Sequence, residues 1–245
     1  MEEMKLETKA GNQIKTEAKA AASRANVQGR TVNPAKAKPA QKQPVVMPEV
    51  KLFNKWGTKG IEVKDLGLQR YISLKAVIVP KSHGRMRRQF HKSEMSIVER
   101  LANHFLVPGH RGKKHLLGSG NCGGKSATAF ILIKNILQTI EDKTKKNPVE
   151  VLVRAVENSA LREEITSYQV GGIMVRKAVV AAPQRRVDLA LRTMVQGAYQ
   201  KAHSNPKGFA AVLADELIAA GSGDSQNSYG VREKERVERE AGGAR

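Results

Sequence analysis

The chain has 245 residues, with 43 Lys and Arg against 23 Asp and Glu, which gives a formal net charge of +20. Such a surplus repels itself and is typical of proteins that bind a polyanion, with nucleic acid and an anionic membrane as the two candidates. A membrane is the weaker one, because no apolar run approaches the roughly 20 residues that span a bilayer and the amino terminus lacks the apolar core of a signal peptide.

Residues 1–47 and 48–245 differ in composition. The first part is rich in Ala, Lys, Gln and Pro and has few large apolar residues, so we predict a basic extension that is unstructured alone and becomes ordered on an anionic partner. A solvated tail without a partner is the alternative. The second part is long enough for one domain with a sizeable core, and its single cysteine, Cys122, excludes an internal disulfide.

The first helices are predicted from caps and apolar stripes. Asp65 can cap a brief helix over residues 65–72. Ser93 or Ser96 can begin the next helix, in which Ser96 and Glu99 have the spacing of a capping box, and the dipeptide at 108–109 ends it.

A second core helix is expected to start near Gly124, with its apolar stripe over residues 130–140. Asn147-Pro148 followed by Glu150 predicts the start of a third helix, because the cap, the proline and the carboxylate each suit the first turn.

Two β-prone runs flank Gly171-Gly172, which predicts a hairpin because both glycines can adopt positive φ. We place this ribbon at about 168–180, with Glu163-Glu164 in the link before it. Pro183 then begins the fourth core helix.

Two further helices are predicted, one from Asn205-Pro206 to Gly221 and a thin, peripheral one over 231–240 that Ser228 caps. The expected fold is mostly α: a bundle of about six helices, with one protruding β-hairpin between the third and fourth core helices.

Arg185 and Arg186 fall in the first turn of the helix that Pro183 begins. The amino end of a helix already carries partial positive charge, so we expect an external anion to neutralise these side chains, with phosphate as the natural candidate. A basic helix that follows a two-stranded arm predicts binding to folded nucleic acid.

Residues 70–115 are the most basic part of the chain, where only Glu94 and Glu99 oppose many cations. A solvated charged surface is the alternative, but this one-sided density favours contact with nucleic acid. Aromatic residues make up 4% of the chain, which favours recognition of backbone and shape over recognition mainly by base stacking. The cations of this part are Arg70, Lys75, Lys81, Arg85, Arg87, Arg88, Lys92, Arg100, Arg111, Lys113 and Lys114.

Metal and nucleotide sites are weaker interpretations. Five of the six histidines lie near Cys122, at His83, His91, His104, His110 and His115. No His–Cys spacing matches a zinc finger, so we expect no metal. The run 119–126 resembles a phosphate-binding loop, but Ser119 stands where that loop requires glycine. Glycines that open a helix beside Lys125 can still hold an RNA phosphate.

No catalytic triad, Cys–His pair or carboxylate pair is found, so we expect neither an enzyme nor a cofactor. Nucleotide hydrolysis and a DNA-binding, chromatin-like role are the alternatives to RNA binding.

From about Pro48 to the carboxyl end, the chain resembles the universal small-subunit ribosomal protein number seven in its archaeal and eukaryotic form, called number five in eukaryotes. The most specific segments are Asn147-Pro148-Val-Glu-Val-Leu-Val, Arg162-Glu-Glu, Val170-Gly171-Gly172 and Pro183-Gln184-Arg185-Arg186-Val-Asp-Leu-Ala-Leu-Arg192. Supporting segments are Lys51-Leu-Phe53, Lys55-Trp56, Ile97-Val-Glu-Arg100-Leu, Gly124-Lys125, Leu213-Ala-Asp-Glu-Leu-Ile218 and Asn227-Ser-Tyr229.

The resemblance implies a cytoplasmic, ribosome-bound protein of the small-subunit head that binds the 3′ major domain of the rRNA and nucleates its folding. It places the ribbon at the subunit interface, near exit-site tRNA and the mRNA exit path. It also implies small-subunit ribosomal proteins number nine and number eleven as neighbours.

The candidate rRNA ligands are Arg85, Arg87, Arg88, Lys92, Arg111, Lys113, Lys114, Lys125, Arg185, Arg186 and Arg192. The candidate ribbon contacts are Tyr168, Val170, Gly171, Gly172, Ile173, Met174, Val175, Arg176 and Lys177. Two departures from the family pattern stand out. Residues 110–123 lengthen a loop, so either the lysines at 113–114 or Lys125 can take the family lysine role, and Arg176 stands where the family commonly has proline.

Overall fold

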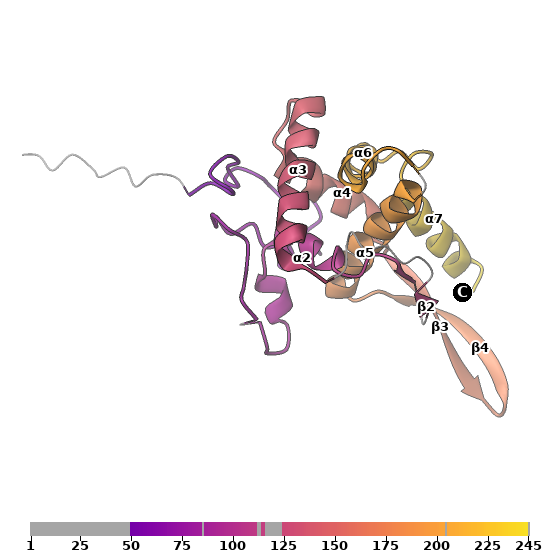
Figure 1. Cartoon of the computed structure of the whole chain (residues 1–245). Helices are drawn as coiled ribbons and strands as arrows, with labels where there is room; N and C mark the ends of the chain where they lie inside the picture. Colours follow the sequence, from indigo (N-terminus) through magenta and orange to yellow (C-terminus); the bar gives the residue numbers. More distant parts are fainter. Residues whose placement is uncertain (1–49, 85, 112–113, 116–123, 204, 245) are drawn as a thin grey trace, which may run out of the picture. The chain divides into compact units, whose positions relative to one another are not determined.

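A long irregular segment before the first helix, a set of helices and one long hairpin make up most of the part of the chain that the structure describes (Figure 1). The structure is a computed structural model and describes residues 50–84, 86–111, 114–115, 124–203 and 205–244, so the predicted extension over 1–47 lies outside it. Its helices are η1 (His91–Glu94), α2 (Ile97–His104), α3 (Ser126–Thr144), α4 (Pro148–Ser159), α5 (Pro183–Ala202), α6 (Phe209–Ser222) and α7 (Tyr229–Gly242). Its strands are β1 (His110–Arg111), β2 (Lys114–His115), β3 (Glu163–Val170) and β4 (Ile173–Val180). The long hairpin lies between α4 and α5, so the predicted mostly α fold with a protruding ribbon is confirmed.

Two predicted caps form. Asn147 Oδ1 accepts a hydrogen bond from Val149 N at 3.0 Å, with Pro148 at the first position of α4. Ser228 Oγ accepts one from Val231 N at 3.3 Å, so α7 starts two residues before the predicted position. Each cap satisfies a backbone N–H that the first helical turn leaves unpaired.

Two predictions near the start of the domain are wrong. The Ser96 side chain makes no capping hydrogen bond, and Glu99 Oε1 accepts from Ser82 N and Ser82 Oγ, both at 2.7 Å. The capping box is therefore absent, and α2 ends at His104. Residues 65–72 form hydrogen-bonded turns that begin at Asp65 rather than a helix.

The start and end of α6 also differ from the prediction. Asn205 Oδ1 accepts from Lys207 N at 3.0 Å, which forms a local turn instead of a helix cap, and α6 begins only at Phe209. It ends at Ser222, where Gly223 adopts the left-handed conformation with φ 76°.

The hydrophobic core forms where α3, α4, α5 and α6 meet. Leu152 of α4, Leu191 of α5 and Leu213 of α6 are completely buried, and Ile140 of α3 joins them. The segment before η1 adds Trp56, whose Nε1 donates to Glu141 Oε2 of α3 at 3.0 Å. This core fixes the helices from which the cationic side chains extend.

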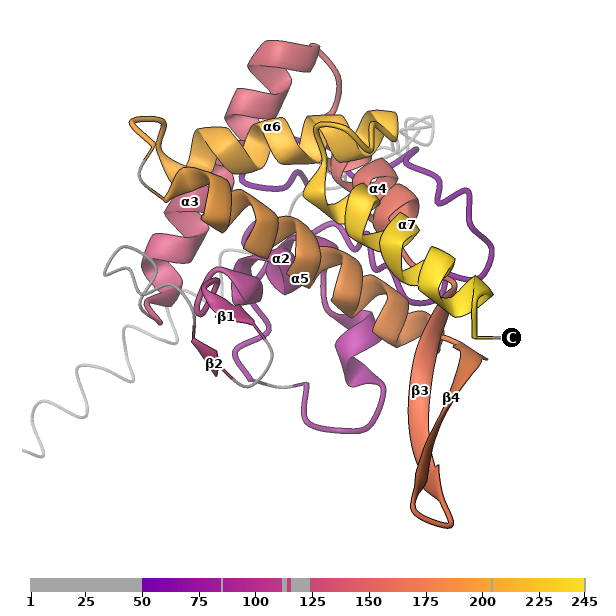
Figure 2. The same ribbon diagram turned by 90° about the vertical axis from the view of Figure 1, so that its right-hand side faces the viewer.

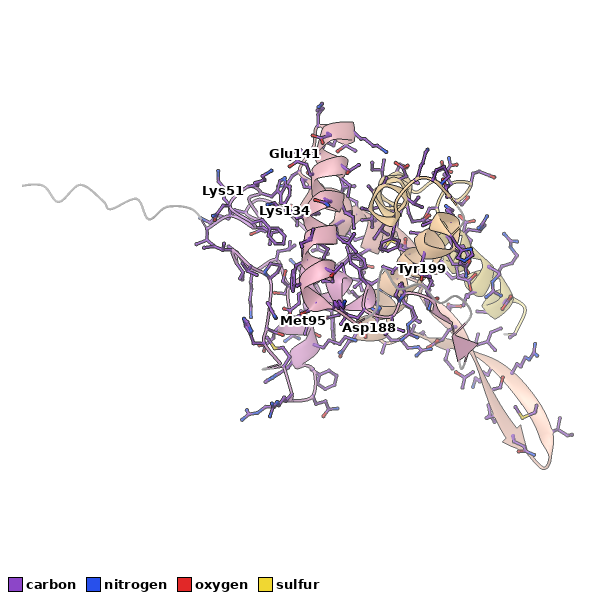
Figure 3. All side chains as sticks on the ribbon, in the orientation of Figure 1. Lys51, Met95, Lys134, Glu141, Asp188 and Tyr199 are labelled. Atoms are coloured by element: carbon purple, nitrogen blue, oxygen red, sulfur yellow. The ribbon has the colours of Figure 1, made fainter. Side chains whose placement is uncertain are left out.

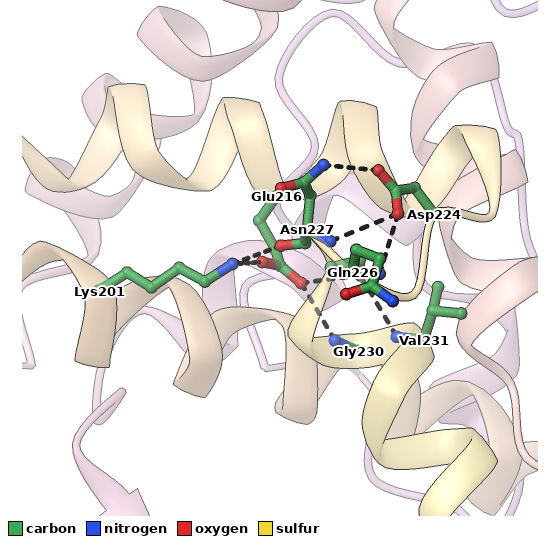
Figure 4. Close-up of polar contacts among 8 residues, drawn as sticks. Lys201, Glu216, Asp224, Gln226, Asn227, Gly230 and Val231 are labelled. Carbon is green, nitrogen blue, oxygen red and sulfur yellow. Dashed lines mark hydrogen bonds and ion pairs between the residues drawn. The ribbon is translucent and has the colours of Figure 1, made fainter.

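A buried carboxylate joins α5, α6 and α7 (Figure 4). Glu216 of α6 is 2% exposed. Its Oε2 lies 2.8 Å from Lys201 Nζ of α5, and its Oε1 accepts from Ser228 Oγ at 2.9 Å and from Gly230 N at 3.0 Å. The predicted last helix is thus firmly attached at its amino end.

Two glycines bring α7 against its neighbours. A Cβ at Gly197 of α5 would lie 2.4 Å from Cβ of Tyr229. A Cβ at Gly230 would lie 2.7 Å from Met194 Cγ. Both contacts are closer than packed carbon atoms approach, so only glycine permits this packing.

Candidate nucleic-acid interface

The two arginines at the start of α5 are neutralised within the chain. Arg185 forms a bidentate pair with Glu164 of β3, with N–O distances of 2.8 to 2.9 Å, yet its side chain stays 56% exposed. Arg186 donates to Asp65 Oδ2 at 2.8 Å and to the Leu161 carbonyl at 3.0 Å, and it is 11% exposed. The sequence predicted an external anion here, whereas Glu164 and Asp65 of the chain itself already pair with these charges.

The Arg186 contact also affects its partner. Burial raises the pKa of Asp65, but hydrogen bonds from Arg186 and from Gly67 N outweigh this effect and leave that pKa below its ordinary value. The pair therefore holds the turn at 65–72 against the start of α5.

A second internal group of charges, Asp188 with Lys92 and Arg100, joins η1, α2 and α5. Asp188 lies 2.8 Å from Lys92 Nζ and 2.8 Å from the guanidinium of Arg100, which also donates to the Tyr71 carbonyl at 2.7 Å. Burial raises the pKa of Asp188, but the hydrogen bonds from Lys92 and Arg100 outweigh this effect, so the net shift is downward. Arg100 is 2% exposed, so it holds helices together instead of facing a ligand.

The predicted ligands Arg87 and Arg88 are exposed on the segment before η1. The Nε of Arg87 donates to the Gly84 carbonyl at 3.3 Å, and His91 N donates to the Arg88 carbonyl at 3.2 Å. Their backbone is thereby ordered, and neither guanidinium has a carboxylate partner among the described residues. A phosphate can therefore approach both side chains.

Two more predicted ligands extend from helices. Lys125 is exposed as the N-cap residue of α3. Arg192 is exposed on α5 and lines a cavity of ≈ 530 Å³ together with Asn103, His104 and Gln196. Burial lowers the pKa of His104 to about 4, so its imidazole is neutral near pH 7.

The side chains of four predicted ligands lie outside what the structure describes. Arg85 and Lys113 lie outside the described residues, as does Cys122. The backbones of Arg111 and Lys114 pair between β1 and β2. Whether the lysines at 113–114 or Lys125 take the role of the family lysine therefore stays open.

The ribbon is longer than predicted and twists out beyond the helices (Figure 2). Glu163 and Glu164 are its first residues, paired with Val180 and Val179, and not a link before it. The turn glycines 171–172 have φ of 56° and 88°, which suits a two-residue hairpin turn.

The base of the ribbon is attached to α7. The Arg162 N–H donates to Glu238 Oε1 at 2.8 Å, and the Ala178 N–H donates to the Ala244 carbonyl at 3.4 Å. The ribbon therefore projects from a fixed base.

The register divides the ribbon into two faces. Tyr168 pairs with Val175 and Val170 pairs with Ile173, so these four residues share one face. Tyr168, Val170 and Ile173 are 45%, 56% and 71% exposed. The other face carries the exposed residues Gln169, Met174 and Arg176, and the exposed Lys177 follows Arg176 on the first face. The ribbon thus offers an apolar face with cations toward its base.

Neither a metal-binding group nor a membrane-spanning helix is present in the described residues. In residues 50–84, 86–111, 114–115, 124–203 and 205–244, no three His, Cys, Asp or Glu side chains are grouped so that they could hold a metal ion. Each helix of this same part is too short or too polar to traverse a lipid bilayer.

Comparison with known proteins gives one consistent family. The model of the family Ribosomal protein S7p/S5e matches residues 68–245. The small ribosomal subunit protein uS7 of Methanococcus maripaludis strain C6 is 44% identical over 198 residues, which cover 80% of this chain and 100% of that protein.

Two other archaeal proteins of the same name agree with this. The protein of Nanoarchaeum equitans is 41% identical over 198 residues, which cover 80% of this chain and 100% of the relative. That of Methanosphaera stadtmanae is 45% identical over 192 residues, which cover 78% of this chain and 96% of the relative. Because the matches contain the whole set of helices α2 to α7 and the ribbon, the chain belongs to the ribosomal protein S7p/S5e family.

Proposed function

We propose that this chain is a structural, non-enzymatic component of the cytoplasmic small ribosomal subunit, where it binds the 3′ major (head) domain of the rRNA and nucleates the folding of that domain. In this proposal the ribbon lies near exit-site tRNA and the mRNA exit path, and small-subunit ribosomal proteins number nine and number eleven are neighbours. Family membership over residues 68–245 is the observation that carries the proposal.

The charge distribution supports rRNA as the partner. Arg87, Arg88, Lys125 and Arg192 are exposed, and within the part of the chain that the structure describes none of them has a carboxylate partner. Cations of this kind neutralise phosphates and release counterions, which lets rRNA helices approach one another. Arg185 and Lys92 are secondary candidates for phosphate binding, because each already pairs with a carboxylate. A phosphate must compete with Glu164 for Arg185 and with Asp188 for Lys92.

The dependence of affinity on salt tests the proposal. We expect the double variant Arg87→Ala/Arg88→Ala to bind a head-domain rRNA transcript more weakly. The slope of log affinity against log salt should flatten by roughly 1.4 to 1.8, because each lost phosphate contact removes about 0.7 to 0.9. An unchanged slope would exclude these arginines from the interface.

A matched control is available at the other end of α3. Lys145 and Lys146 are adjacent, exposed cations near Glu141, and Figure 3 shows Glu141 far from Met95. The variant Lys145→Gln/Lys146→Gln should leave the slope closer to that of the wild type. Equal affinity of the wild-type chain for duplex DNA and for the transcript would contradict specific rRNA binding.

A further inference from the structure

Only two aromatic side chains of this chain are exposed. The sequence has 5 Phe, 4 Tyr and 1 Trp, all within the described residues. Eight of them are buried or half-buried, whereas Phe90 is 61% and Tyr168 is 45% exposed. Tyr168 belongs to the ribbon, but Phe90 has no part in the site described so far.

The backbone of Phe90 is in an unfavourable conformation. Its φ of 64° and ψ of −5° are left-handed, which glycine and asparagine adopt readily and a bulky residue does not. The exposed ring gains little from burial to offset this cost. Residues held in such conformations cluster at binding sites, where the surrounding structure imposes them.

The surroundings of Phe90 hold it in place. Its carbonyl accepts from Ser93 N at 3.0 Å, and η1 follows directly. The helix is fixed to α5 by the Lys92–Asp188 pair at 2.8 Å, and Ile97 N donates to the Ser73 carbonyl at 3.1 Å just beyond it. The ring therefore extends from a backbone that is held in place on its carboxyl-terminal side.

The charges around the ring indicate what it contacts. Residues 81–93 contain five Lys and Arg and no Asp or Glu. Arg87 and Arg88, three and two residues before the ring, are exposed. A segment that carries both an exposed ring and exposed guanidinium groups is complementary to a nucleotide, which has an apolar base face and an anionic phosphate. An apolar pocket on a protein would not require this one-sided charge.

We infer that Phe90 is a platform on which one unstacked base of the rRNA stacks, while Arg87 and Arg88 bind phosphates beside it. This inference rests on the proposed function. It adds base recognition at one point to binding that elsewhere depends on backbone and shape. Stacking does not neutralise charge, so its signature differs from that of the arginines.

Three substitutions separate stacking from a structural role. Phe90→Leu keeps an apolar side chain without a ring, and we expect it to bind the head-domain transcript about 5- to 100-fold more weakly with an unchanged salt slope. Phe90→Trp should bind at least as tightly as the wild type. Phe90→Gly should lose affinity like the leucine variant while its melting temperature stays equal or rises, because glycine relieves the backbone strain.

Wild-type affinity for Phe90→Leu, or a lowered melting temperature for Phe90→Gly, would overturn the inference. If instead the wild-type chain shows no preference for the transcript over duplex DNA, the proposed function fails.

Fluorescence gives a direct readout of stacking. The native Trp56 is 4% exposed, so the additional emission of the Phe90→Trp variant reports on position 90. Quenching of that emission on addition of the transcript is expected when a base stacks on the indole. Emission that stays constant while the variant binds would contradict the platform.

Discussion

The start of α5 and the segment 81–93 are both rich in cations, but their charges have different fates. Arg185 and Arg186 meet Glu164 and Asp65 within the chain. The segment 81–93 has no carboxylate of its own, and of the cations that the structure describes in it only Lys92 has a carboxylate partner, Asp188. Charges of the first kind stabilise the fold, whereas charges of the second kind remain for a ligand. Net charge alone does not distinguish the two.

The largest effect on stability is expected when Asp188, the carboxylate that pairs with both Lys92 and Arg100, is removed. Asp188→Ala leaves the buried guanidinium of Arg100 without its anion, and we expect a loss of about 3 to 5 kcal/mol in the free energy of unfolding. Denaturant titration measures it. Arg192→Ala, one turn further along α5 and exposed, should change stability by less than about 0.5 kcal/mol. A small effect of Asp188→Ala would mean that the network is not structural.

Acid should weaken the same region. The pKa of His104 is about 4 because the imidazole is buried, while nearby Lys92, Arg100 and Arg192 oppose its protonation and Asp188 favours it. Between pH 6.5 and about 4 the unfolded chain binds a proton that the folded chain does not, so stability falls as the pH is lowered, by roughly 3 kcal/mol in total.

Unfolding measured across this pH range checks the expectation. His104→Gln cannot titrate and should flatten the dependence, whereas substitution of the exposed His83 by Gln should leave it nearly unchanged. Identical pH profiles for His104→Gln and the wild type would show that the imidazole does not couple to folding.

The smallest expected effect separates the two neighbouring arginines. Arg186→Ala removes hydrogen bonds to Asp65 and to the Leu161 carbonyl in a nearly buried place, which should cost about 2 kcal/mol. Arg185→Ala breaks an exposed pair and should cost less than about 1 kcal/mol. Thermal unfolding of both variants decides the order. Equal losses would erase the distinction between them.

Local signals in the sequence predicted most of the fold. The Asn147 and Ser228 caps, the glycine pair at 171–172 and the proline at 183 act on their immediate neighbours, and each occurs where the pattern indicates. Among the predictions that failed, the Asn205 cap is replaced by a local turn, in which Asn205 Oδ1 accepts from Lys207 N, whereas the capping box is lost to a partner distant in the chain. Glu99 matches a capping box, but Ser82 competes for its carboxylate.

The candidate site was less predictable for the same reason. The sequence identifies the cations, but their partners are distant in the chain, as with Asp65 and Arg186 or Lys92 and Asp188. The sequence does not predict a binding role for Phe90, because the exposure of its ring and its positive φ are properties of the folded chain. A single aromatic residue inside a run of cations was the only signal available.

The glycine contact between α5 and α7 has a consequence at a distance. A methyl group at Gly197 would displace Tyr229 and, with it, the helix whose far end is bonded to the root of the hairpin. The direction in which the hairpin tip points therefore depends on glycines in the interface between α5 and α7, which does not contact the tip. Substitutions that misdirect the tip can lie in a place where no ligand binds.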